Sequence, residues 1–481
     1  MPDEDFKLSY GLYIGKNHTR DGHAWLAGYG DEPSSHWLEI VPRQSHEPGS
    51  SIEVGVDSTA DLPGVRTNIP QVATTARHIR VSYSYYMGVP APITNGGLNS
   101  YGVAVRDIWS TSRDELVAMT PKDQSGPNYS DLARIVLERA QTAREGVEII
   151  GELIEAHGES SYGGNSHIIA DPDEAWVVIQ FAGGQGLWVA ERLGADSIRA
   201  SRPGYIELVP VDEPDHPDFL YPAHFVDLAI EKGWYEAGPF DANQVYGDGK
   251  GRWEGVRWIE AEMSRRASEP AKIGLQDMMW AMRTPKLTGD TAGYGQVVPL
   301  IHPVHNSLRM IWHSAIGAVA APFVPVFLGQ DSLPPEYGMH RYLTRGEGHR
   351  FLDTRKLLEG SQDSLSHAPQ QNEMHRSAVY ECKRLFYLML QQTERFADEV
   401  HEVFEAYEAN VIEHLPMILK TAEISLTRQD EATANQLLEY FSTKEMSSAL
   451  KLVQVLADSI EARVKALGLA KSDVQMFDQI W

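Results

Sequence analysis

The distribution of tryptophan and proline constrains the fold of this chain most strongly, because it divides the 481 residues into two unlike parts. Ten of the eleven tryptophans lie before residue 313, and 25 of the 27 prolines lie at or before Pro335. The first part is dense in Gly, Pro, Tyr and Trp, which is typical of strands and turns. The later part has apolar side chains at helical spacing. We therefore predict a core over residues 9–340 and a helical extension over residues 341–481.

The order of local patterns within the core predicts an α+β fold. Apolar alternating runs predict strands, the sequence Asn-Gly-Gly at 95–97 predicts a turn, and a capping box predicts the start of a helix. The expected strands are 10–14, 23–27, 78–86, 99–105, 166–170, 176–180 and 187–190, and the expected helices are 130–140 and 142–157. Strands, then a pair of helices, then strands indicate antiparallel sheets with helices packed on them.

Charge and hydropathy exclude several classes of function. The formal net charge is −25, from 67 acidic and 42 basic residues, and such a chain repels nucleic acid and anionic lipid. The most apolar stretch, residues 315–328, is too short for a membrane span and holds two prolines. The acidic N-terminus has no apolar segment of a secretory signal. We expect a cytoplasmic protein that binds neither nucleic acid nor membrane, and a homo-oligomer is compatible with the sequence.

Metal and cofactor sites have weak support in the sequence. His302, His305 and His313 lie close together, and the His-x-x-His spacing could place two imidazoles on one helical face. A proline between the first two histidines and the missing glutamate of the zinc-protease motif argue against a metal. The single cysteine, Cys382, excludes a cysteine-based zinc site within one chain. We expect no metal and no cofactor.

Ser9 is a candidate nucleophile because it follows an acidic, turn-like segment of eight residues and immediately precedes a strand. When a short leader is removed, a serine at the new N-terminus can use its own α-amine as the base. That amine has a pKa of about 7.7–8.0, close to working pH. A serine before a strand is usually only a serine, so this pattern alone leaves both interpretations open.

The segment 9–22, Ser-Tyr-Gly-Leu-Tyr-Ile-Gly-Lys-Asn-His-Thr-Arg-Asp-Gly, resembles the mature start of the dipeptidase A family. These are N-terminal nucleophile hydrolases related to secernins and choloylglycine hydrolases. Further similar segments follow in order at 95–104, 142–147, 163–167 and 173–176. The resemblance extends from Ser9 to about residue 330. It implies a four-layer αββα sandwich that hydrolyses dipeptides.

The resemblance also implies roles for particular residues. Ser9 would be the nucleophile, at a position where the relatives have cysteine, after removal of the candidate leader 1–8. Asp31 would hold the freed α-amine through a charge-assisted hydrogen bond. Asn165 would contact the oxyanion or the amine, although a turn role is equally open. The substrate, a small peptide or amide, would lie against Trp109 and Tyr85, with Tyr83 and Tyr86 as further candidates for the pocket wall.

One departure from the family concerns an arginine that relatives carry where this chain has Gly28. Arg106, Arg192 or Arg309 could take its place from elsewhere in the chain. Arg106 is also a candidate substrate-binding residue, as is Asn99, for which a structural role is the alternative.

Two other functions remain open from the sequence. The chain could be a non-catalytic relative that serves as a binding scaffold. It could also be an amidase or acylase that is specialised on one metabolite.

Overall fold

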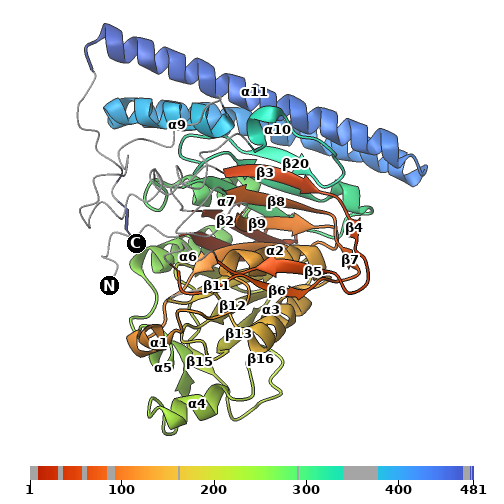
Figure 1. Cartoon of the computed structure of the whole chain (residues 1–481). Helices are drawn as coiled ribbons and strands as arrows, with labels where there is room; N and C mark the ends of the chain where they lie inside the picture. Colours follow the sequence, from red (N-terminus) through yellow and green to blue (C-terminus); the bar gives the residue numbers. More distant parts are fainter. Residues whose placement is uncertain are drawn as a thin grey trace.

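The computed structural model describes residues 9–30, 36–56, 62–83, 93–160, 163–289, 292–339, 377–469, 477 and 479–480. Figure 1 shows two stacked β-sheets, helices on their outer faces, and two long helices that run along one side of the molecule. The predicted site residues Asp31 and Tyr85 lie outside the described residues, as do Tyr86 and the boundary near residue 340.

The first sheet is antiparallel and six-stranded. Its strands in spatial order are β14 (Ile198–Ser201), β1 (Tyr10–Ile14), β2 (Ala24–Gly30), β18 (Tyr294–Leu300), β19 (Met310–Ser314) and β20 (Val324–Phe327). The expected first hairpin is present, with Tyr10 opposite Tyr29 and Gly11 opposite Gly28. The strand that begins directly after Ser9 therefore lies inside a sheet, between β14 and β2.

The second sheet is antiparallel and eight-stranded. Its strands in spatial order are β16 (Phe219–Leu220), β13 (Trp188–Leu193), β12 (Ala175–Gln180), β11 (Asn165–Ala170), β10 (Ala104–Trp109), β9 (Ile93–Asn99), β8 (His78–Tyr83) and β3 (His36–Val41). The turn predicted at 95–97 is wrong, because these residues lie within β9 and the chain reverses after Asn99. A Cβ atom on Gly96 would come within 2.6 Å of the Tyr294 hydroxyl, so this glycine serves close sheet packing.

The chain also forms three small two-stranded sheets and several short helices outside the two large sheets. The small sheets pair β4 (Gln44–Ser45) with β7 (Thr74–Thr75), β5 (Ser51–Val54) with β6 (Thr67–Pro70), and β15 (Leu208–Val209) with β17 (Phe240–Asp241). The short helices are α1 (Asp114–Met119), α4 (Phe225–Glu231), α5 (Ala242–Val245), η1 (Lys16–His18), η2 (Asn306–Leu308), η3 (Pro335–Tyr337) and η5 (Leu390–Gln392).

The two large sheets pack face to face because each strand alternates its side chains between an inner and an outer face. Tyr13 and Leu26 of the first sheet share one apolar core with Ile108 of the second. Side chains one position away turn outward. Leu12 joins a core with the helices behind the first sheet, and Val105 joins a core with the helices behind the second.

Helices α2 (Tyr129–Arg139) and α3 (Ala143–His157) cover the outer face of the eight-stranded sheet, as predicted from the sequence. Asn128 caps α2 and accepts hydrogen bonds from the main-chain N–H groups of Ser130 and Asp131. Thr142 caps α3, and Gly158 ends it with a positive φ of 81°.

Helices α6 (Glu254–Ala267), α7 (Leu275–Arg283) and α10 (Thr393–Thr427) pack on the outer face of the six-stranded sheet. Helix α9 (Ala378–Met389) and helix α11 (Glu431–Ala466) complete the helical C-terminal region, and α11 lies along the edge strand β20. The Ser442 hydroxyl donates a 2.8 Å hydrogen bond to the Pro325 carbonyl there. The predicted α+β fold, an αββα sandwich with a helical C-terminal region, is confirmed.

Candidate active site

Ser9 lies at the entry to β1 and is 5% exposed. Because Tyr10 is opposite Tyr29, the register places Ser9 opposite Gly30 at the end of β2. Side chains two positions apart on a strand share a face, so Ser9 faces the same side as Gly11 and Tyr13, toward the eight-stranded sheet. The predicted nucleophile thus lies at one end of the space between the sheets.

Two glycines in the first hairpin let the sheets approach closely beside Ser9. A Cβ atom on Gly11 would lie 2.7 Å from the Ile108 Cδ1 atom and 3.4 Å from the Arg106 Cγ atom. A Cβ atom on Gly28 would collide with the main-chain carbonyl oxygen of Tyr10, and it would lie 2.7 Å from the Arg106 Cδ atom and 2.8 Å from its Nε atom. The side chain of Arg106 therefore occupies the volume that a side chain at position 28 would need.

Arg106 is completely buried and holds three strands together. Its Nη2 atom donates a 2.7 Å hydrogen bond to the Tyr29 carbonyl of β2. Its Nη1 atom donates to the Tyr294 hydroxyl of β18 at 2.7 Å, and also to both oxygens of Asn95 of β9. Every one of these acceptors is neutral, so the guanidinium is buried without a carboxylate among the residues that the structure describes.

The polar network around Arg106 continues between the sheets, where the core of a sandwich is normally apolar. The Tyr294 hydroxyl contacts the side chains of Asn95 and Gln296 at 3.4 and 3.2 Å. The ring of Tyr294 packs against His36 and His313. Burial, and then the neighbouring His36, lower the pKa of His313 to about 3, so His313 is neutral at physiological pH.

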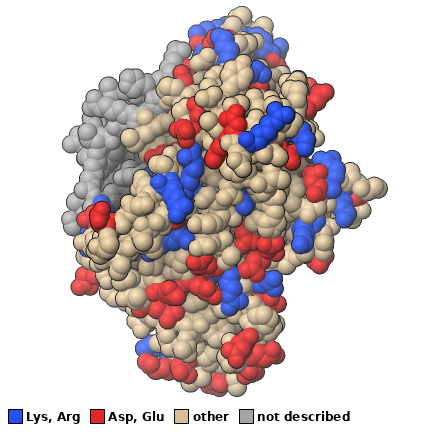
Figure 2. All heavy atoms as spheres, turned by 90° about the vertical axis from the view of Figure 1, so that its right-hand side faces the viewer, with Lys and Arg blue, Asp and Glu red and all other residues tan. Residues whose placement is uncertain are grey.

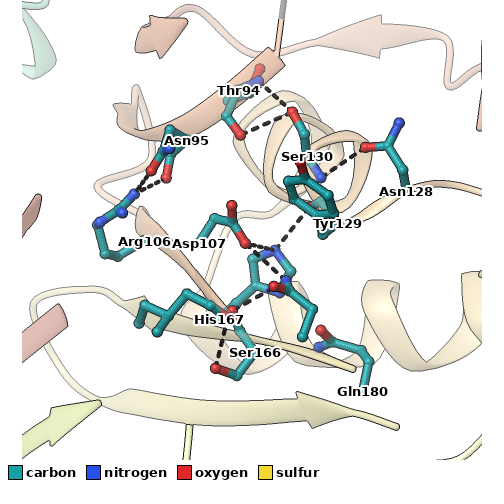
Figure 3. Close-up of polar contacts among 12 residues, drawn as sticks. Thr94, Asn95, Arg106, Asp107, Asn128, Tyr129, Ser130, Ser166, His167 and Gln180 are labelled. Atoms are coloured by element: carbon teal, nitrogen blue, oxygen red, sulfur yellow. Dashed lines mark hydrogen bonds and ion pairs between the residues drawn. The ribbon is translucent and has the colours of Figure 1, made fainter. Parts of the chain in front are cut away.

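A second polar cluster lies on the opposite, outer face of the eight-stranded sheet, beneath α2 (Figure 3). The Asn165 amide donates a 2.8 Å hydrogen bond to Asp107 Oδ1, and His167 Nε2 lies 3.7 Å from the same oxygen. His167 Nε2 also lies 3.0 Å from the Tyr129 carbonyl. Burial lowers the pKa of His167 to about 4. The histidine is therefore neutral near pH 7 and accompanies Asp107 as a polar partner rather than as a cation.

Glu159 adds a further carboxyl group near this outer cluster. It is 8% exposed, and its Oε1 atom has no hydrogen-bond partner in the described part of the chain. Burial, and then the Asp107 carboxylate, raise the pKa of Glu159 to about 8. The side chain is therefore largely protonated at neutral pH, which removes the cost of burying its charge.

Two of the predicted site residues, Trp109 and Asn165, lie on neighbouring strands of the eight-stranded sheet. Trp109 is half-buried at the end of β10 and opposite Asn165, and its carbonyl accepts a 3.2 Å hydrogen bond from Gly204 next to β14. Trp109 and Asn165 thus lie at the end of the sandwich where Ser9 lies. The Asn165 amide, however, is engaged with Asp107 on the outer face, so its catalytic role stays a prediction.

Asn99 lies at the other end of the eight-stranded sheet and has a structural environment. Its amide donates to the Leu137 and Ala140 carbonyls at the end of α2, and its carbonyl oxygen accepts from the main-chain N–H groups of Tyr101 and Val103. With these four hydrogen bonds to main-chain atoms, the side chain has no remaining group for a substrate, which argues against the predicted substrate contact.

Of the three arginines considered as replacements at Gly28, only Arg106 reaches that position. Arg192 lies at the surface on β13 and pairs with Glu174 and Asp218. Arg309 donates to the Ile301 carbonyl, beyond the opposite end of β18 from Tyr294.

The three histidines weighed as metal ligands do not form a common site. The His302 imidazole lies 3.0 Å from Asp173 at the surface, His305 caps η2, and His313 is buried between the sheets. Within the described ranges, no three His, Cys, Asp or Glu side chains are arranged to hold a metal ion.

Acidic side chains dominate the surface at the end of the molecule that carries α4. Figure 2 shows Asp and Glu gathered over this end and along the middle of the face in view, with Lys and Arg interspersed above. Asp212, Glu213 and Asp215 are among the exposed residues there. None of the described helices is long and apolar enough to cross a membrane.

Comparison with known proteins adds to these observations. By its layers, the chain is an αββα sandwich, and residues 65–253 match the model of peptidase family C69. A probable dipeptidase from Salmonella dublin is 31% identical over 155 residues, which make up 31% of this chain and 34% of the relative. Probable dipeptidase B from Lactococcus lactis subsp. lactis (strain IL1403) is 32% identical over 102 residues, or 21% of each chain. The chain thus spans about a third or less of these curated relatives.

The resemblance to the dipeptidases is confirmed over this matched segment. Arg106 and Asn165 lie within it, whereas Ser9 and Gly28 precede it. A solved structure of a mutant conjugated bile acid hydrolase from Clostridium perfringens is also similar, at 10% identity and a TM-score of 0.31. That alignment covers 67% of this chain and 93% of the hydrolase.

The sequence interpretation missed several residues of the inner network. The predicted turn at 95–97 includes Asn95, and the predicted site residues do not include Tyr294, Gln296 or His36. A signal was present in Asn95 and Gln296, because a polar side chain inside an otherwise apolar strand needs a partner.

Proposed function

We propose that this protein is an amide hydrolase of dipeptidase type, in which Ser9 becomes the N-terminal residue and acts as the nucleophile. The observation that carries the proposal is the position of Ser9, buried at the entry to β1 and facing the polar network between the sheets. The match of residues 65–253 to peptidase family C69 supports the reaction class. The relatives' dipeptidase names suggest the substrate class.

The reaction would proceed in two steps. The Ser9 hydroxyl oxygen attacks the amide carbonyl carbon while its proton passes to the free α-amine of Ser9. The carbon–nitrogen bond then breaks, the leaving amine takes that proton, and an ester to Ser9 remains. Water adds to the ester carbonyl carbon and gives a proton to the same amine. The ester bond then breaks, the amine returns that proton to the Ser9 oxygen, and the acid product leaves. The α-amine exists only after residues 1–8 have been removed.

The surrounding groups would have supporting roles in this proposal. Asp31 would hold the α-amine, and Asn165 would contact the oxyanion or the amine. Trp109 and Tyr85 would contact the substrate. The buried start of β1 supplies the rigidity that a nucleophile needs, because its main chain is fixed between β14 and β2.

The test compares wild-type protein with Ser9→Ala and Ser9→Cys on a panel of dipeptides and N-acyl amino acids. We expect wild-type protein to release amino acids, Ser9→Ala to lose at least about a thousandfold in turnover, and Ser9→Cys to retain hydrolysis. Ser314→Ala is a matched control, because Ser314 is a fully buried strand serine whose hydroxyl donates to the Ile316 carbonyl. That variant should keep its turnover.

The panel also separates the alternatives. Turnover of one N-acyl compound without dipeptide hydrolysis would indicate a specialised acylase. Binding of these compounds without hydrolysis in any variant would indicate a scaffold. Undiminished turnover in Ser9→Ala would remove Ser9 from the chemistry.

A further inference from the structure

We infer that Gly28 and Arg106 work as one pair, in which the missing side chain on β2 admits a guanidinium from β10 that positions the start of β1 for hydrolysis. This inference rests on the proposed function and identifies Arg106 as a positioning residue of the same site. The pair joins two strands of different sheets, 78 positions apart in the sequence.

The first support is the path of the Arg106 side chain. It passes Gly11, where a Cβ atom would be 3.4 Å from Arg106 Cγ, and then Gly28, where a Cβ atom would be 2.7 Å from Arg106 Cδ. It ends at the Tyr29 carbonyl, 2.7 Å from Nη2. This path runs along β2 toward the end that faces Ser9, on the side of the sheet to which Ser9 points. Even the methyl group of alanine at position 28 would collide with it, and also with the main-chain carbonyl oxygen of Tyr10.

The second support is the set of elements that the guanidinium joins. It donates to β2 through Tyr29, to β18 through Tyr294 and to β9 through Asn95. Register pairs both Tyr10 and Gly295 with Tyr29, so the Tyr29 carbonyl belongs to the row of residues directly beside Ser9. Loss of the guanidinium would remove the Tyr29 hydrogen bond between β2 and the eight-stranded sheet.

The third support is the state of the charge itself. Arg106 has no carboxylate within ion-pair distance in the described part of the chain, and its Nε atom is buried there without a hydrogen-bond partner. A buried charge without an opposite charge is costly, and such a group needs an explanation beyond stability. We assign that explanation to the place of its acceptors, since the Tyr29 carbonyl lies in the row of residues beside Ser9.

The experiment measures kcat, KM and unfolding in urea for Arg106→Gln, Arg106→Lys and Gly28→Ala. We expect Arg106→Gln and Gly28→Ala to lower kcat about a hundredfold, with KM within about threefold of wild type. Arg106→Lys keeps the charge and should recover at least about a tenth of wild-type kcat. Arg309→Gln is the matched control, because Arg309 is 9% exposed and donates to a main-chain carbonyl far from Ser9. It should lose stability without losing kcat.

Each outcome decides the inference. An Arg106→Gln protein that folds and keeps kcat within about threefold of wild type overturns it, as does a Gly28→Ala protein with full kcat. If Arg106→Gln does not fold, equal kcat in Gly28→Ala, Arg106→Lys and wild type overturns it. The Ser9→Ala variant, measured alongside, separates the two claims. Its inactivity supports the proposed function whatever Arg106 does, and a wild-type protein without hydrolysis overturns both.

Discussion

Arg106 and Arg283 are both buried arginines, but the protein treats their charges differently. Arg283 lies at the end of α7 in the outer layer, where both terminal nitrogens donate to the carboxylate of Glu408 on α10. Arg106 lies between the sheets and, among the described residues, donates only to neutral oxygens. The opposite charge of Glu408 offsets the cost of burying Arg283. The buried charge of Arg106 has no such partner among the residues described and lowers the stability of the folded chain. Its presence near the predicted nucleophile is therefore better explained by function than by stability.

The Arg283 pair also shows how the C-terminal helices are joined to the sandwich. Glu408 accepts a hydrogen bond from the Phe323 main-chain N–H, and Arg283 Nε donates to the Ala318 carbonyl. His401 of the same helix α10 lies 3.0 Å from the Val319 carbonyl. These contacts fix the segment between β19 and β20 under α10. The helical region therefore shares its core with the six-stranded sheet, whatever boundary is drawn near residue 340.

The largest expected effect comes from breaking the paired arginine. Glu408→Ala leaves the Arg283 guanidinium buried without its carboxylate, so we expect the free energy of unfolding to fall by about 3–5 kcal/mol. Turnover per folded molecule should stay unchanged, because the two side chains contact each other, the Ala318 carbonyl and the Phe323 N–H group rather than the network around Arg106. Urea denaturation followed by circular dichroism measures the loss.

The control for this variant is Glu423→Ala on the same helix. Glu423 pairs with Lys420 at the surface, where an ion pair contributes less than about 1 kcal/mol. A Glu408→Ala protein as stable as the Glu423→Ala protein would contradict the structural role assigned to the Arg283 pair.

A smaller effect concerns Glu159, a buried carboxyl group. Glu159 becomes neutral by keeping its proton, whereas a buried arginine such as Arg106 stays charged. The pKa of Glu159 in the folded chain is about 8, against about 4.5 when unfolded. Between these values the folded state binds the extra proton, so stability from this group is present at low pH and is lost as pH rises toward 8. Glu159→Gln cannot lose a proton and should remove this part of the pH dependence.

The measurement compares urea denaturation of wild type and Glu159→Gln at about pH 5.5 and about pH 8.5. Most of the fall in the free energy of unfolding is expected between these two pH values. We expect wild type to lose about 3 kcal/mol more than the variant across this range. The same pH dependence in both proteins would show that Glu159 is ionised in the folded chain and that the comparison with Arg106 is wrong.

Much of the fold could be predicted because local patterns decide it. The cap at Thr142 and the stop at Gly158 predicted α3, and alternation predicted β1 and β11 to within one residue. The confinement of tryptophan and proline to the first part predicted the helical C-terminal region. These signals are carried by neighbours in sequence, so they can be interpreted without knowledge of packing.

The site could be predicted only in part, because it depends on contacts between distant strands. The glycines after Asn95 were interpreted as a turn, although Gly96 serves the close approach of Tyr294. Sequence alone could not tell which of three arginines reaches Gly28, since that depends on the stagger between the two sheets. The strand expected at 99–105 also stopped short of Arg106 and Asp107, which lie on β10 (Ala104–Trp109), face opposite sides and belong to different clusters (Figure 3).

The central claim is that Ser9 becomes the N-terminal residue of a working hydrolase, and the mass of the intact active protein tests it most directly. Full-length protein is expressed, purified by its hydrolysis of dipeptides, and examined by intact-mass measurement and N-terminal sequencing. The account predicts a chain that begins at Ser9 and has lost residues 1–8. A preparation that hydrolyses amides at full rate while its chains all retain Met1 would contradict the free-amine mechanism.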